Sequence, residues 1–351
     1  MDRPIILREG CYTDADLHQL KKEKPLWKIR DVYEKQLCEL FEIMHPSLRG
    51  MHAYADEKKI FLRSRSQKEK GDWVYFPWSG VLTHMVNEEE YFCLRTNRNR
   101  NLITEEEQKK LSLATLAFVG LSVGSHIAIA CAYSGIGLHF KLAEFDTLDT
   151  TNLNRVRGRL DQVGEPKIGV LAQQLYEINP YLQLEFFEKG LTENTLQPLL
   201  KASTPQIVFE IIDNFEMKIR LRLACRESKV PVLMFANLGD SILVDIERYD
   251  LDEKLPLFNG VIGDMPEEIL KNPDVTDEMK HRYAVELVGR ENVPQKAIAS
   301  VGEIGKTLVG RPQLMSTVTI SGGMGAFLAK QLLLKEEIKG GRRLIKFGDF
   351  I

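Results

Sequence analysis

A glycine-bearing turn in the middle of the chain has the composition of a phosphate-binding loop. It runs from Gly120 through Ser122 and Gly124 to Ser125, between an apolar run and an alanine-rich stretch. Glycines let backbone N–H groups approach phosphate oxygens, and the N-terminus of a following helix adds positive potential. The turn is not a regular GxGxxG, because Ser122 and Ser125 stand where glycines can occur. By itself it predicts a phosphate site and leaves the nucleotide open.

An acidic residue follows at the end of the next apolar run. This residue, Glu144, comes 24 positions after Gly120. A carboxylate at this point can bind a ribose hydroxyl. A nicotinamide-dependent oxidoreductase fits the turn and the acidic residue as well as an ATP-using protein does, so the choice depends on residues further along.

Polar side chains also follow later strands, namely Asn152, Arg155, Lys167 and Asp213. Since open α/β sheets bind ligands at the carboxyl ends of neighbouring strands, we expect these side chains to gather at that edge. Arg155 and Lys167 can neutralise the β- and γ-phosphates of a triphosphate. Asp213 can bind Mg²⁺, which prefers carboxylate oxygen. Each residue alone fits a surface ion pair, whereas the ordered set favours a triphosphate with Mg²⁺ over a dinucleotide.

This ordered set resembles the ThiF/MoeB superfamily, which includes the ubiquitin-activating enzymes. The resemblance covers about residues 98–250, with a weaker tail to 335. The motifs that carry it are VGLSVGS (119–125), EFDTLDTTNLNR (144–155), VGEPK (163–167), EINPYL (177–182) and IIDN (211–214). The wider pattern is similar to a bacterial branch of ThiF-type adenylyltransferases. The glycine-bearing turn is one residue shorter than is usual in the superfamily and has fewer glycines.

The resemblance implies a role for each matched residue. Glu144 takes the place of the aspartate that binds ribose, and Asp146 that of a second aspartate. Arg155 and Lys167 match the phosphate-binding pair. Asp213 matches the aspartate that binds magnesium.

The resemblance also implies a two-fold homodimer. An arginine before the first strand of such enzymes reaches into the neighbouring subunit's site. Arg100 matches this arginine best, with Arg98 as the alternative. A basic linker that pairs with the following glutamates at the surface is the competing interpretation of the same residues.

The activity that the resemblance implies is adenylation of a carboxylate. A carboxylate oxygen attacks the α-phosphorus of ATP, which forms an acyl-adenylate and releases pyrophosphate. Many relatives then pass the acyl group to a cysteine. No cysteine follows Cys225 in this chain, and Cys225 itself lies in an expected helix as a buried thiol. We therefore expect adenylation without a thioester.

The expected substrate is the C-terminal carboxylate of a peptide or of a small ubiquitin-like or sulfur-carrier protein. Adenylation of a small-molecule or tRNA-borne carboxylate, as in the dehydratases of this superfamily, is the first alternative. A nucleotide-binding scaffold without catalysis and an NAD(P) oxidoreductase are the others. Lys plus Arg total 47 and Asp plus Glu total 50, a net charge of −3, which argues against general nucleic-acid binding.

Alternating apolar and helical segments must position these residues. Alternation from residue 113 onward predicts an α/β fold, a Rossmann-like, mostly parallel sheet with helices on both faces. We expect strands at 113–119, 140–145, 182–187, 207–212, 230–235 and 242–246, and helices at 126–133, 167–178, 192–200 and 215–226. A buried helix is expected within 314–335.

The domain organisation predicted is a small α+β region at 1–95, which helps to recognise the partner, and an adenylation domain at 96–351. Residues 21–44 are rich in Lys, Glu and Leu and look helical. Residues 72–78 look like a strand broken by Pro77. Residues 251–312 are irregular, either an ordered substrate-binding segment with short helices or a disordered one.

Composition and cysteine usage bound the class of protein. Apolar residues make up 44% and charged residues 28%, values that rule out wholesale disorder. The chain has no run of eighteen apolar residues and no secretory pattern at its start, so we expect a cytoplasmic protein without a membrane span. Its five cysteines are dispersed without a CxxC pair, so no structural zinc is expected.

Overall fold

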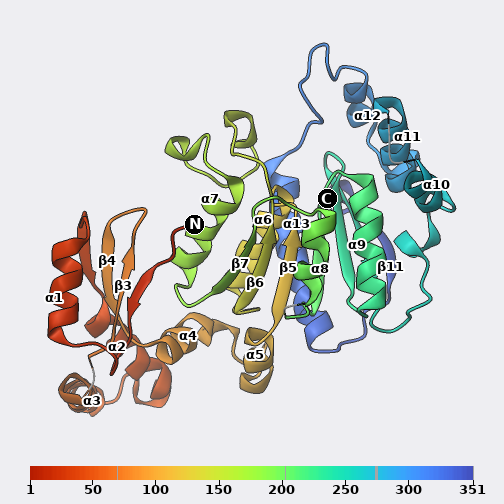
Figure 1. The fold of residues 1–351 in the computed structure, drawn as a ribbon. Coiled ribbons are helices and arrows are strands. Elements are labelled where there is room, and N and C mark those ends of the chain that lie inside the picture. Colours follow the sequence, from red (N-terminus) through yellow and green to blue (C-terminus); the bar gives the residue numbers. More distant parts are fainter. Residues whose placement is uncertain (69, 202, 273–275, 351) are drawn as a thin grey trace. The chain divides into compact units, whose positions relative to one another are not determined.

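The computed structural model describes residues 1–68, 70–201, 203–272 and 276–350 (Figure 1). The chain divides into two compact units. Unit 1 comprises residues 1–108, 133–135 and 173–182, and unit 2 comprises residues 109–132, 136–172 and 183–351. No helix in the described ranges is both long and apolar enough to cross a lipid bilayer.

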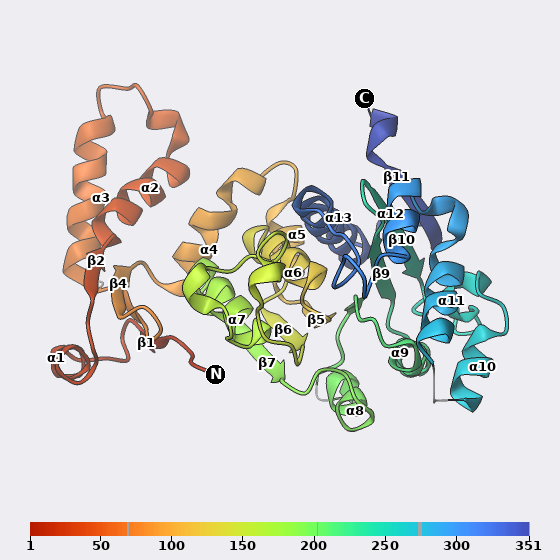
Figure 2. The ribbon, with the colours of Figure 1, turned by 90° about the horizontal axis from the view of Figure 1, so that it is seen from above.

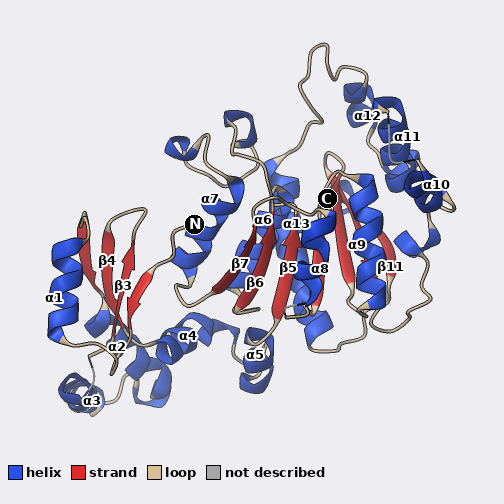
Figure 3. Ribbon diagram, in the orientation of Figure 1, coloured by secondary structure: helices blue, strands red, loops and turns tan. Residues whose placement is uncertain are grey.

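Unit 1 contains a mixed sheet with helices beside it (Figure 3). In the described residues the strand order is β1-β3-β4-β2, with β3 antiparallel to β1 and β4 and with β2 parallel to β4. The elements up to residue 112 are β1 (Ile5–Leu7), α1 (Asp14–Glu23), β2 (Lys28–Asp31), α2 (Tyr33–Met44), α3 (Tyr54–Lys68), β3 (Asp72–Phe76), β4 (Val81–Met85), α4 (Glu88–Thr96) and α5 (Glu105–Ser112). The expected α+β character of the N-terminal region is confirmed.

The helical segment expected over residues 21–44 is interrupted, so that prediction was wrong in its middle. Helix α1 ends at Glu23, and Lys24 is extended, with φ −99° and ψ 142°. Lys24 precedes Pro25, and a residue before proline is disfavoured in the helical conformation. The exposed strand β2 follows, and a helix resumes only at Tyr33.

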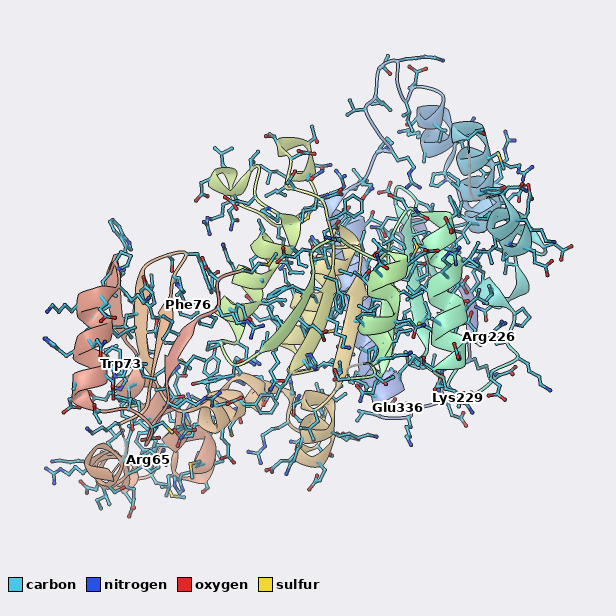
Figure 4. The ribbon with its side chains drawn as sticks, in the orientation of Figure 1. Arg65, Trp73, Phe76, Arg226, Lys229 and Glu336 are labelled. Carbon is cyan, nitrogen blue, oxygen red and sulfur yellow. The ribbon has the colours of Figure 1, made fainter. Side chains whose placement is uncertain are left out.

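Strand β3 confirms the strand expected at 72–78 and ends at Phe76, directly before Pro77. Trp73 and Phe76 are labelled on this strand in Figure 4. The Trp73 indole stacks on His84 of β4, with ring centroids 4.4 Å apart. Trp73, Tyr75 and Leu82 belong to a small apolar core. The aromatic run therefore builds a core local to unit 1.

Unit 2 is built on a sheet with the predicted mostly parallel topology. In its described residues the order is β11-β10-β9-β8-β5-β6-β7, parallel from β9 to β7, while β10 and β11 are antiparallel to their neighbours. The strands are β5 (Thr115–Val119), β6 (His139–Ala143), β7 (Gln183–Phe187), β8 (Ile207–Glu210), β9 (Val232–Asn237), β10 (Ser241–Glu247) and β11 (Gly341–Lys346). Strand β11 was not expected; it spans only six residues, and their burial does not alternate.

Helices cover both faces of this sheet, as expected. Figures 1 and 2 show α6 and α13 on one face and α8 and α9 on the other. The helices of this part of the chain are α6 (Val123–Tyr133), α7 (Lys167–Ile178), α8 (Glu193–Lys201), α9 (Phe215–Glu227), α10 (Met265–Lys271), α11 (Asp277–Val288), α12 (Gln295–Val301) and α13 (Met315–Leu333). Leu199 of α8 and Leu221 of α9 pack with Ala117 and Val119 of β5. The buried helix expected within 314–335 is confirmed as α13.

The segment at 251–312 contains the expected short helices, α10 to α12. Phe258, Ile269, Tyr283 and Leu287 from this segment are buried with Met234 of β9 in one apolar cluster. These described parts of the segment are therefore packed on the sheet.

Charged side chains lie in the core beside this cluster. Arg222 of α9 has no exposed surface and donates to Glu210 of β8 and to Glu247 of β10, both at 2.7 Å. Burial alone would lower the pKa of Arg222, but Glu247 and Glu210 raise it above its usual value. The backbone N–H of Phe258 donates to Glu247 at 2.7 Å, and the Arg222 guanidinium lies 3.8 Å from the Phe258 ring centroid. This network joins the sheet to the 251–312 segment.

Replacing Arg222 by Met should lower the free energy of unfolding by about 3–5 kcal/mol, because Glu210 and Glu247 lose their buried cation. Chemical denaturation measures the loss. Arg220→Met is the matched control, since Arg220 lies in the same helix and pairs with Glu216 near the surface. That control should cost less than about 1 kcal/mol. Equal losses in both variants would contradict the importance of the buried pairs.

Candidate nucleotide site

The predicted glycine-bearing turn joins β5 to α6 at the point where the strand order reverses. Strand β5 lies between β6 and β8, and parallel sheets bind ligands at such a switch point, outside the carboxyl ends of the strands. Gly120 has φ +90°, a conformation that favours glycine. A Cβ at this position would lie 2.4 Å from the carbonyl oxygen of Ile211, which follows β8. The close approach explains why glycine is required here.

Helix α6 begins at Val123, earlier than the predicted residue 126. Gly124 and Ser125 therefore lie in its first turn, where backbone N–H groups have no partner within the helix. The Ser125 hydroxyl donates to the carbonyl oxygen of Ser122 at 2.9 Å, which closes the turn. The strand, turn and helix give the geometry of a phosphate-binding site.

Glu144 ties this turn to the loop that follows β6. Its side chain is buried, and its carboxylate accepts hydrogen bonds from the backbone N–H groups of Leu121 at 2.9 Å, Phe145 at 2.9 Å and Asp146 at 3.1 Å. The carboxylate thus orders two loops at the ligand edge. A contact between Glu144 and ribose stays a prediction.

Asp146 positions Lys167. The Lys167 ammonium donates to the Asp146 carboxylate at 2.8 Å, and the Lys167 backbone N–H donates to the Asp146 carbonyl at 2.9 Å. Lys167 is the first residue of α7, and its side chain is nearly buried. The double contact holds this cation beside the loop that also carries Asn152 and Arg155.

Part of the Arg155 guanidinium has no partner among the residues that the structure describes. Its Nη1 atom donates to the carbonyl of Thr151 at 3.2 Å and to the Asn154 side chain at 2.9 Å. Its Nε atom is buried and has no hydrogen-bond partner in the described residues. Burial lowers the pKa of Arg155. An anion can satisfy the remaining donors, so this side chain fits a phosphate. Asn152, which is buried, accepts from the Asp149 backbone N–H at 3.1 Å and shapes the same loop.

His126 was not among the predicted site residues, although it follows the phosphate turn directly. Its Nε2 atom lies 2.9 Å from the carbonyl oxygen of Arg155. Burial, with a smaller effect of Arg157, lowers the pKa of His126 to about 4. The ring is therefore neutral at pH 7, with its proton on Nε2 for donation to Arg155. The sequence around a single histidine on an apolar helix does not distinguish this role from that of an ordinary buried histidine.

Asp213 follows β8 at the same edge, as predicted. Its side chain is 90% exposed, and the Arg311 guanidinium donates to it at 2.6 Å. No group of three or more His, Cys, Asp or Glu side chains in the described ranges is arranged to hold a metal ion. Mg²⁺ is often held by one or two carboxylates together with substrate phosphates. An exposed carboxylate next to a phosphate-binding turn fits that arrangement.

Arg98 and Arg100 belong to unit 1. Arg98 lies in a short 3₁₀ helix (Asn97–Asn99) that Arg100 follows, and both side chains are exposed. Their action in a neighbouring subunit stays a prediction. The residues that the structure brings together through direct contacts are the turn, Glu144, Asp146 and Lys167.

Residues 96–241 match the model of the ThiF family. The chain carries a ThiF-family domain. The matched range includes the turn, Arg155, Lys167 and Asp213, so these candidate site residues lie within it. Arg311 lies outside the matched range.

Proteins similar to this chain include one without a described activity and two named enzymes. An uncharacterized protein of Mycobacterium tuberculosis is 31% identical over 275 residues, which are 78% of this chain and 38% of that protein. This chain therefore spans about two fifths of that relative's length. The tRNA threonylcarbamoyladenosine dehydratase of Bacillus subtilis is 25% identical over 248 residues, which are 69% of this chain and 96% of the dehydratase. The molybdopterin-synthase adenylyltransferase of Haemophilus influenzae is 28% identical over 173 residues, which are 48% of this chain and 69% of the adenylyltransferase.

The crystal structure of PaaA has a similar fold. It superposes with a TM-score of 0.51 at 19% identity, over 74% of this chain and 77% of PaaA. The likeness agrees with the α/β architecture described above and indicates the fold alone.

Both cysteines within the range that matches the ThiF family are buried. Cys131 of α6 and Cys225 of α9 are buried, and burial raises the pKa of both thiols. The prediction that Cys225 is a buried core thiol is confirmed.

His126 should make stability depend on pH. Its pKa is about 4 in the folded chain and about 6.5 when unfolded, so protonation favours unfolding as the pH falls from 6.5 to 4. His126→Asn keeps an N–H donor but does not titrate. The difference in unfolding free energy between wild type and this variant should shift by about 3 kcal/mol between pH 7 and pH 4, in favour of the variant.

Urea denaturation at a series of pH values measures this shift. His52→Asn, at an exposed position, is the control for the substitution itself. If the His126→Asn difference does not change with pH, the ring does not remain neutral in the folded chain.

Proposed function

We propose that this protein is an ATP- and Mg²⁺-dependent adenylyltransferase that activates a carboxylate as an acyl-adenylate and releases pyrophosphate. What supports the proposal is that Lys167, Arg155 and Asp213 lie on the connections that follow β6 and β8, the two neighbours of β5, within the range that matches the ThiF family. ATP requires such cations because charge accumulates on its leaving pyrophosphate. A dinucleotide does not require them beyond its own pyrophosphate.

The chemistry consists of positioning and charge neutralisation. A carboxylate oxygen forms a bond to the α-phosphorus while the bond from that phosphorus to pyrophosphate breaks. Lys167, held by Asp146, and Arg155, whose carbonyl accepts from His126, neutralise the leaving group. Asp213 would hold Mg²⁺, which would supply further positive charge for this neutralisation. The backbone N–H groups of the turn, ordered by Glu144, bind phosphate oxygen.

We propose the C-terminus of a peptide or of a small ubiquitin-like or sulfur-carrier protein as the substrate. The relative from Haemophilus is named an adenylyltransferase, which supports adenylyl transfer by a similar domain. Unit 1 offers a surface for such a partner, because strand β2 is an exposed sheet edge. Trp27 and Ile29 at this edge are 83% and 48% exposed. An extended peptide can add a strand to such an edge.

A tRNA-borne carboxylate is the second candidate. It is favoured by the dehydratase of Bacillus subtilis, whose sequence this chain covers almost completely. The net charge of −3 gives no general attraction to nucleic acid. ATP–pyrophosphate exchange separates the candidates. Synthetic peptides with free C-termini should support exchange, and the same peptides with amidated C-termini or bulk tRNA should not. Exchange with tRNA alone would select the second candidate.

The proposal includes three further points. The acyl group does not pass to a cysteine of this chain, since no cysteine follows the buried Cys225. The protein acts in the cytoplasm. It works as a homodimer, in which Arg100 of one subunit, or Arg98 instead, completes the site of the other.

Asp213→Ala should reduce ATP–pyrophosphate exchange a hundredfold or more, since a charge-stabilising group of this kind contributes roughly 3–4 kcal/mol. Asp240→Ala is the matched control, because Asp240 is an exposed carboxylate on the connection between β9 and β10 at the same edge. The control should keep most of the activity. A result in which the two variants behave alike would refute the assignment of Asp213.

Mixing two inactive variants tests the homodimer. Arg100→Ala and Asp213→Ala subunits should form mixed dimers in which one site has both defects and the other has neither. Exchange activity should then recover toward a quarter of the wild-type value. An arginine donated in trans contributes on the order of 10³–10⁵ in rate in phosphoryl-transfer enzymes. If labelled subunits are seen to exchange while activity stays at background, Arg100 does not act across the interface.

A further inference from the structure

The chain segment that leads into α13 contacts loops on both sides of the phosphate turn. Arg311 donates to Asp213, which follows β8, at 2.6 Å. The carbonyl oxygen of Gln313 accepts from the side chain of Asn154, which follows β6, at 2.9 Å. Strands β8 and β6 are the two neighbours of β5 in the sheet. Residues 311–313, here called the strap, therefore bridge the loops that flank the turn after β5.

The strap is anchored at its C-terminal end by α13. A Cβ on Gly322 would lie 2.9 Å from the His126 carbonyl oxygen, and one on Gly325 would lie 2.5 Å from Ile127, so α13 packs closely on α6. The Thr317 hydroxyl also donates to the Gly239 carbonyl at 2.5 Å. With α13 held in this way, Arg311 remains within side-chain reach of the ligand edge if its contact with Asp213 is released.

The ion pair between Arg311 and Asp213 is weak enough to be exchanged. The two side chains are 54% and 90% exposed. Exposed pairs contribute little to stability, because water screens the charges. The guanidinium nonetheless donates to one of the two oxygens of the carboxylate that a metal ion at Asp213 would use, and its positive charge opposes a cation there. Metal and Arg311 therefore compete for this side chain.

We propose that Arg311 is a further phosphate-binding residue of the nucleotide site, an inference that rests on the proposed function. Without ligand, Arg311 neutralises Asp213. With ATP bound, Asp213 would hold Mg²⁺ and the Arg311 guanidinium would donate to phosphate oxygens. The planar fork of an arginine suits this exchange, since it matches carboxylate and phosphate geometry alike. Arg311 lies 70 residues beyond the range matched by the family model.

Two binding measurements give opposite shifts if the proposal holds. Arg311→Ala should weaken binding of Mg²⁺ with α,β-methylene-ATP roughly tenfold, because a charge-assisted contact to phosphate is lost. The same variant should bind Mn²⁺ without nucleotide up to about fivefold more tightly, because a competitor for Asp213 is removed. A surface ion pair without a ligand role leaves nucleotide binding unchanged. Calorimetry measures the first affinity and electron paramagnetic resonance the second.

Two more variants complete the experiment. Lys306→Ala removes an exposed positive charge from the stretch before the strap and should change neither affinity. Arg311→Lys keeps the charge but not the fork and should give an intermediate nucleotide affinity. If Arg311→Ala binds the nucleotide like Lys306→Ala, the inference about Arg311 is wrong while the proposed function stands. If the wild type binds nucleotide but catalyses no exchange, the proposed reaction fails and the binding results still decide the role of Arg311. A wild type that binds no nucleotide overturns both.

Discussion

The ligand edge of unit 2 depends on one buried carboxylate. Glu210 is the last residue of β8 and has no exposed surface. Burial alone would raise its pKa, but Lys218 and Arg222 outweigh that effect and lower it. The ionised carboxylate accepts from the backbone N–H of Ile212 at 2.9 Å and from the Lys218 ammonium at 2.7 Å. It therefore sets the exit of β8, and with it the position of Asp213.

The same carboxylate connects the site to the far part of the chain. Through Arg222 it is linked to Glu247, which accepts from the backbone of Phe258. The 251–312 segment is thus tied to the strand that positions Asp213. A buried ion pair gives little net stability over an apolar contact, but loss of one partner is costly. The network therefore limits how the 251–312 segment can pack on the sheet, because a packing that leaves one of these charges without its partner is costly.

A second layer of residues prepares the phosphate-binding cations. Asp146 holds Lys167, and neutral His126 holds the backbone of Arg155. The Glu144 carboxylate accepts from the backbone N–H groups of Leu121 in the turn and of Asp146 in the loop after β6, so it orders both segments. Each of these contacts is short and partly buried, so it restricts the reach of a long side chain before any ligand arrives. A preorganised set of donors costs little rearrangement during the reaction.

The sequence by itself determined the order of strands and helices from β5 to β10 and the sheet edge at which the candidate site residues were expected. Apolar runs alternating with helical segments specify a parallel sheet, and parallel strands bring Gly120, Asp146 and Asp213 to one edge wherever the loops go. Only the tertiary structure decided which groups hold them. The pairing of Arg311 with Asp213 joins residues 98 positions apart, and the interruption of the 21–44 helix required the conformation of a residue before proline. Local periodicity carries no information on contacts across such distances, because they form only once packing has placed the segments together.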